Sequence, residues 1–209
     1  MRTRILVVFL LALVAASLCL EAQDGAAKNG TSEYGSLVAS LKGGATIIDY
    51  AKLRLSYMDS PEYKNAKNTS VAEKAMSVAL NAKDYPKALK NADEVLASDY
   101  VNIDAHFIEF IAHREMGHTE QAEFHKAVFR GLLTSIQNSG DGLSAEKAWV
   151  VINDHEEYVV LRALGYMPGE QSLMHKNGHA YDVMKVKKVQ DGTEQTFYFN
   201  VDIPMAHGL

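Results

Sequence analysis

Apolar residues recur at every third or fourth position through the middle of the chain, which is the spacing of amphipathic helices. The pattern predicts a helix after the turn at residues 83–86, one that starts near Thr119, and others over residues 47–58, 71–81 and 103–116. Pro86 is compatible with a first helical turn, because the N–H groups of that turn have no partner inside the helix. Gly117 is typical of a helix end.

The helical region contains an internal period of 34 residues. Ala88 and Ala122 are separated by this period, and Val95 matches Phe129 at the same offset. Paired helices with this period, and a small residue that lets the two helices approach closely, are typical of tetratricopeptide repeats. The proline that usually ends each repeat is missing. Two repeats rarely bury a core alone, so we expect other elements to cover their ends.

The pattern changes after residue 138. Asn138–Gly142 is rich in turn-forming residues, and the pairs Asn177-Gly178 and Asp191-Gly192 favour hairpin turns. The runs around these turns predict a helix over residues 155–164 and strands over residues 149–152, 172–174, 180–187 and 196–201. The sequence therefore predicts an α+β fold, in which tetratricopeptide-like antiparallel helix pairs precede a small antiparallel β-sheet with one helix.

The N-terminus predicts export. Arg2 and Arg4 precede a short apolar run, so we interpret residues 1–22 as a signal peptide and expect a periplasmic or secreted mature protein. The run is shorter than the ~20 residues of a membrane span, and no later segment is apolar enough to form one. A bulky leucine precedes Cys19, which disfavours a lipoprotein. Residues 23–45 are small, polar and rich in glycine, and we expect a flexible leader there.

The rest of the chain is expected to form one cooperative unit over residues 46–209. A tetratricopeptide-like helical half covers residues 46–138, and a small α+β half packed on it covers residues 139–209. The break between them is too short for a free linker, and the second half is too small to bury much core of its own. The shared contact is expected to involve Leu132, Leu133, Ile136, Trp149 and Phe197.

Composition and missing motifs exclude several classes of function. The net charge of −5 becomes −6 when Arg2, Arg4 and Glu21 leave with the signal peptide, so nucleic-acid binding is not expected. Cys19 is the single cysteine and lies in the signal peptide, which leaves no disulfide and no thiolate ligand. The chain has no phosphate-binding glycine loop, no His-Glu-x-x-His motif and no nucleophile elbow, and no cofactor is expected.

A group of histidines is the main candidate for chemistry. His106, Glu109 and His113 share one side of their predicted helix, and His125 lies in the apolar stripe of the next helix. In an antiparallel pair, His106 or His113 would approach His125, and two imidazoles with a carboxylate can bind Zn²⁺. This gives a metal-site hypothesis based on His106, His113 and His125. The simpler alternative is that these histidines are interior residues with ordinary hydrogen-bond partners.

Arg130 and Asp141 flank the predicted end of the helix that starts near Thr119 and carries His125. With His106 and His125 they define an alternative function, a small metal-dependent or hydrolytic enzyme whose site lies between the helical half and the sheet. Arg130 could instead form a structural ion pair with a carboxylate, and such pairs are common without function.

Long segments of the chain resemble an uncharacterised bacterial family, domain of unknown function 4919. They are LRLSYMDSPEY (53–63), DAHFI (104–108), EFHKAVFRGLLTSIQNSGDG (123–142), EEYVVLRALG (156–165) and YFNVDIP (198–204). The resemblance spans residues 47–204 and implies an exported protein with tetratricopeptide-like helices, but no particular activity or site. The leading hypothesis is therefore a non-enzymatic module that binds a protein or peptide on its stacked helices.

Overall fold

The computed structural model describes residues 32–208, and the predicted signal peptide lies outside this range. The described chain begins with α1 (Glu33–Lys42), within the segment 23–45 for which the sequence predicts a flexible leader. That expectation is wrong for residues 33–42. Ser32 caps the helix by accepting a hydrogen bond from the N–H of Gly35, and Tyr34 and Leu41 are buried in the core. Two large side chains anchor a helix that otherwise consists mainly of small residues.

The central helices agree with the sequence pattern to within a few residues. They are α2 (Tyr50–Met58), α4 (Ser70–Asn81), α5 (Tyr85–Ser98), α6 (Ile103–Glu115) and α7 (Thr119–Gln137). Ser60 and Pro61 end α2 and also start a short helix, α3 (Pro61–Lys64), because the Ser60 hydroxyl accepts from the N–H of Tyr63. Asp49 caps α2 in the same way through Lys52.

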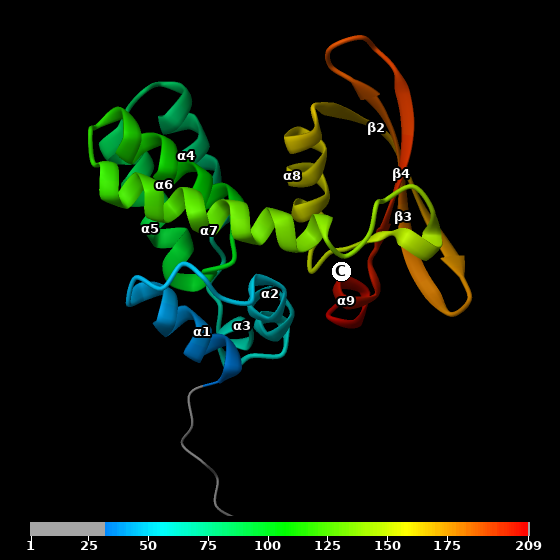
Figure 1. The fold of residues 1–209 in the computed structure, drawn as a ribbon, viewed down its shortest axis with the longest axis horizontal. Helices are drawn as coiled ribbons and strands as arrows, with labels where there is room; N and C mark the ends of the chain where they lie inside the picture. Colours follow the sequence, from blue (N-terminus) through cyan, green and yellow to red (C-terminus); the bar gives the residue numbers. More distant parts are fainter. Residues whose placement is uncertain (1–31, 209) are drawn as a thin grey trace, which may run out of the picture. The chain divides into compact units, whose positions relative to one another are not determined.

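Consecutive helices pack against one another from α4 to α7 (Figure 1). Ala88 on α5 and Ala122 on α7, the small residues of the 34-residue period, are both buried. The face of α7 beyond this array is covered by α2. Gly131 on α7 makes this contact close, since a Cβ atom there would lie 2.2 Å from the ring of Tyr50 on α2. Helix α2 is thus one of the other elements that we expect to cover the ends of the repeats, and it does so at α7.

The second half contains a sheet and two further helices. Its elements are the 3-10 turn η1 (Ala145–Lys147), β1 (Trp149–Val150), α8 (Asp154–Leu164), β2 (Tyr166–Lys176), β3 (His179–Lys188), β4 (Glu194–Asn200) and α9 (Asp202–Ala206). Strands β2, β3 and β4 form an antiparallel meander, and Asn177 and Gly178 turn the first hairpin with positive φ angles of 53° and 83°. Pro204 follows the last strand and lies inside α9.

The sequence predicts an all-antiparallel sheet, and the direction of β1 shows that this prediction is wrong. The strand order is β1-β4-β3-β2, and β1 runs parallel to β4. No tight turn joins β1 to its neighbour, because α8 and two strands intervene in the sequence, so the strand direction is not fixed locally. The α+β class itself is as the sequence predicts.

One hydrophobic core contains residues from both halves, including Leu132 and Ile136 of α7 with Trp149 and Phe197 of the sheet. Leu133, expected at the same contact, is only half-buried. Helix α8 packs against α6 and α7 as well as β2. Cooperative folding of the two halves stays a prediction. Within residues 32–208 no helix combines the length and the apolar character that a membrane crossing requires.

Candidate metal centre

The histidine-rich side of α6 faces α5 and α7. Asn102 caps α6 by accepting from the N–H of Ala105, and this starts a helix on which His106, Glu109 and His113 recur every three or four residues. Helix α7 begins after the turn at Gly117, whose φ of 79° favours glycine, and brings His125 back to the same level. Two neighbouring helices therefore present the ligand-type side chains to one another.

Three ligand atoms converge between the helices. The carboxylate Oε2 of Glu109 lies 3.1 Å from Nε2 of His113 and 3.9 Å from Nε2 of His125. One ligand atom from each of the three residues lies within 4.8 Å of the other two. Glu109 is buried, whereas the two histidines are partly open to solvent. The group thus has a buried carboxylate on one side and a route to solvent on the other.

Burial governs the charges of these groups. It raises the pKa of Glu109 to about 8, with a contribution from Asp93 on α5. It lowers the pKa of His125 to about 4, helped by His113, and it lowers the pKa of His113 as well, helped by His118. Neutral imidazoles are the form that binds metal ions. The Oε1 atom of Glu109 is buried and has no hydrogen-bond partner within the described residues.

The convergent set differs from the set predicted from the sequence. Glu109 takes the place of His106, which is fully buried and lies behind His125, with 3.0 Å between their Nδ1 atoms. His118, which the sequence analysis did not single out, lies behind His113 in the same way, also at 3.0 Å between Nδ1 atoms. Each of the two convergent histidines is therefore backed by a second imidazole.

Arg130 and Asp141 are not brought to the histidines. Arg130 lines an open groove between α2 and α7, beside Tyr50 and Thr134. Asp141 lies in an exposed turn, where it accepts from the N–H of Leu143 and pairs with Lys147. Of the four residues proposed for an enzyme, only His106 and His125 are in contact.

Within residues 32–208, the lysine or arginine that is buried is Arg54 on α2. Its guanidinium binds both carboxylate oxygens of Glu156 on α8, with 2.7 Å from Nε to Oε1, and both side chains are almost completely buried. Its remaining N–H groups reach the hydroxyl of Ser135 and the carbonyl of Val150. Sequence reasoning missed this pair because its members are 102 residues apart. Each of the three guanidinium nitrogens has at least one acceptor, so the cluster has a structural character.

A third buried carboxyl, that of Glu157, lies where α8 meets the sheet. Burial, followed by the charge of Asp182 on β3, raises the pKa of Glu157 to about 9. Gln171 on β2 donates to Asp182 at 2.6 Å and accepts from the hydroxyl of Tyr158. We interpret protonated Glu157 as a neutral contact between α8 and β3.

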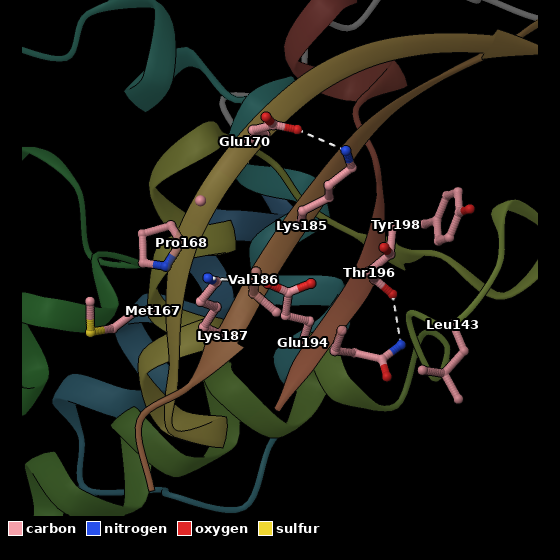
Figure 2. A pocket seen from close by; sticks show the side chains of 12 residues that line it. Leu143, Met167, Pro168, Glu170, Lys185, Val186, Lys187, Glu194, Thr196 and Tyr198 are labelled. Carbon is pink, nitrogen blue, oxygen red and sulfur yellow. Dashed lines mark hydrogen bonds and ion pairs between the residues drawn. The ribbon is translucent and has the colours of Figure 1, made fainter. Parts of the chain in front are cut away.

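A hollow with a volume of about 760 Å³ lies on the outer face of the sheet (Figure 2). Side chains from β2, β3 and β4 line it, and Figure 2 shows Glu170 directed at Lys185 across two strands. A second pair joins Lys187 to Glu194 at 3.1 Å. These charges neutralise one another on an exposed surface, so the hollow offers no strong charge or buried polar group for a ligand.

The fold and these contacts define an α+β protein with a helical half, a small mixed sheet and a candidate metal centre between two helices. The model of a family described as a domain of unknown function, DUF4919, matches residues 25–207, and the chain belongs to this family. The family predicted from the resemblance is thereby confirmed. Neither the comparison with curated proteins nor the comparison with solved structures gives a match.

Proposed function

We propose that this chain is an exported metal-binding protein that holds one Zn²⁺ ion with Glu109, His113 and His125. The observation that carries the proposal is the convergence of one carboxylate oxygen and two imidazole nitrogens within 4.8 Å. Tetrahedral zinc with ligand bonds of ~2.0–2.1 Å places its ligand atoms about 3.3 Å apart. The 3.1 Å distance from Glu109 to His113 fits, and the 3.9 Å distance to His125 has to close by about 0.6 Å.

The state of Glu109 supports a cation at this position. A buried carboxylate without a positive partner is costly and is held in its neutral form. Glu109 has this raised pKa, and one of its oxygens has no partner among the described residues. A Zn²⁺ ion beside Oε2 would supply the missing charge, and the neutral histidines need lose no proton to bind it.

The donor set favours zinc over the hard cations. Two imidazoles and one carboxylate suit Zn²⁺ and its first-row neighbours, whereas Ca²⁺ and Mg²⁺ prefer sites made of oxygen atoms. Three protein ligands leave the fourth zinc position to water or to another ligand. The alternative hypothesis of a metal-dependent or hydrolytic enzyme requires Arg130 and Asp141 close to the metal ion. The positions of these two residues give that hypothesis no support.

Zinc binding can be tested by isothermal titration and by competition with a coloured chelator. Wild type is expected to bind one Zn²⁺ per chain at micromolar concentration or below, and His125→Ala and Glu109→Gln should lose most of this affinity. His175→Ala removes an exposed histidine from β2 and serves as the matched control. Absence of binding by wild type, or unchanged binding by His125→Ala, would contradict the proposal.

A second candidate, the protein-binding module, is supported by one surface. Val71 and Val78 on α4 are 82% and 59% exposed, whereas Ala105 and Ala112, the residues 34 positions later on α6, are fully buried. The helix face that is covered on α6 is therefore exposed on α4, the first helix of the array. Another helix pair would fit on this exposed face.

The expected occupant is a helix pair of a partner protein. Capture of that partner from a periplasmic or secreted fraction should be lost in a Val71→Glu, Val78→Glu variant that keeps its helical circular dichroism. Zinc binding is the internal control, since the altered face lies on α4 and not at the metal centre. Capture that survives the double substitution would remove this candidate.

A further inference from the structure

The ring of His106 is held between a backbone carbonyl and His125. Its Nε2 lies 3.0 Å from the carbonyl oxygen of Tyr100, and its Nδ1 lies 3.0 Å from Nδ1 of His125. His106 is fully buried, and the ring of Tyr100 packs edge-on against it at 5.0 Å between ring centres. The imidazole therefore has little freedom to turn or to find another partner.

These contacts decide where the protons lie. A carbonyl oxygen can only accept, so Nε2 of His106 must carry the hydrogen. In a neutral imidazole the other nitrogen, Nδ1, then has a free lone pair. A distance of 3.0 Å between two nitrogens requires one hydrogen between them, and this hydrogen must come from Nδ1 of His125. The remaining nitrogen of His125, Nε2, is left with its lone pair.

We infer that His106 is a positioning residue, which uses the carbonyl of Tyr100 to fix His125 in the one tautomer whose Nε2 lone pair can bind a metal. The inference rests on the proposed function, because it assigns a role to His106 at that same site. Nε2 is the atom of His125 that lies on the Glu109 side, 3.9 Å from Oε2. Metal-binding histidines are oriented in this way, by donating their other ring N–H to a neighbouring acceptor. Here the acceptor is a second histidine.

The alternative is that His106 only fills space in the core. Two substitutions separate the roles. In His106→Asn, the amide oxygen can take the place of Nδ1 and accept from His125. In His106→Leu, the volume is kept but the acceptor is lost. A space-filling residue would tolerate leucine better than asparagine, whereas a positioning residue requires the reverse order.

The first measurement is the tautomer of His125 in the metal-free protein, read from nitrogen-15 shifts of its ring. Wild type and His106→Asn should show hydrogen on Nδ1, and His106→Leu should show a mixture or the Nε2–H form. The second is the affinity for Zn²⁺, which should fall by about 10–100-fold in His106→Leu, less in His106→Asn, and not at all in the surface control His175→Leu.

The outcomes distinguish this inference from the proposed function. Hydrogen on Nε2 of His125 in wild type would overturn the inference, as would wild-type zinc affinity in a folded His106→Leu variant. If wild type binds no zinc, the proposed function fails, whereas the tautomer measurement on the metal-free protein still shows whether His106 directs His125. If His106→Leu does not fold, two measurements still test the inference. They are the tautomer of His125 in wild type and the Zn²⁺ affinity of His106→Asn.

Discussion

Removal of the buried Arg54 charge should destabilise both halves of the protein together. Arg54 on α2 binds Glu156 on α8 through two hydrogen bonds and also reaches Ser135 on α7 and the carbonyl of Val150 on β1. A single guanidinium therefore joins the helical half to the strand that starts the sheet. Arg54→Met keeps an unbranched apolar side chain as far as the ε position and removes the guanidinium with all four hydrogen bonds.

The expected cost follows from what remains behind. Glu156 has 3% of its side chain exposed and would keep only the hydrogen bond from the N–H of Ile152. Breaking a buried ion pair from one side costs ~3–5 kcal/mol, because the other charge stays buried without its partner. For a folded unit of this size, that corresponds to a fall in melting temperature of roughly 6–20 °C. Adding Glu156→Gln to Arg54→Met should recover part of the loss.

Urea denaturation with two probes provides the assay. Trp149 is the single tryptophan and reports on β1, whereas far-ultraviolet circular dichroism reports mainly on the helices. Both probes should shift to the same lower midpoint if the halves unfold as one unit. Lys185→Met breaks the exposed pair with Glu170 and should leave both midpoints almost unchanged. A loss below ~1 kcal/mol for Arg54→Met, or separate midpoints for the two probes, would refute the reasoning.

Two further predictions concern pH and packing. Burial and Asp182 raise the pKa of Glu157 from 4.5 to about 9. Between these pH values, the folded chain keeps a proton on Glu157 that the unfolded chain loses. The free energy of unfolding should therefore fall as the pH rises through this range. Glu157→Gln should flatten this fall in urea titrations at about pH 5 and about pH 8, and unchanged slopes would contradict the assignment. Gly131→Ala should cost ~1–3 kcal/mol through its clash with Tyr50, in spite of a helix-propensity gain of ~0.5–1 kcal/mol. The same substitution in a Tyr50→Leu background should cost less, and an equal cost would exclude the clash as its cause.

Local patterns predicted most of the helical half. Periodicity located α4 to α7, because each helix buries one regular apolar stripe and ends at a residue with clear terminal chemistry, such as Gly117. Helix α1 was missed because only Tyr34 and Leu41 are buried among small and polar residues. The direction of β1 was missed because its partner β4 lies some 50 residues later and no turn geometry links them.

The candidate metal centre could be predicted only in part, for a related reason. Helical spacing places His106, Glu109 and His113 on one side of α6, but it does not say which of them share an ion. His106 and His113 are seven residues apart, about 10.5 Å along a helix axis, whereas the ligands of one zinc ion lie only about 3.3 Å from each other. His125 contacts one end and the middle of this row, because its two ring nitrogens point in different directions, Nδ1 to His106 and Nε2 towards Glu109. We therefore propose Glu109, in the middle of the row, as the ligand that shares an ion with His113 and His125, and His106, at the buried end, as the residue that orients His125. These different roles depend on the position of α7 along the axis of α6. Tertiary packing sets that position, so the helical pattern of the sequence does not show it.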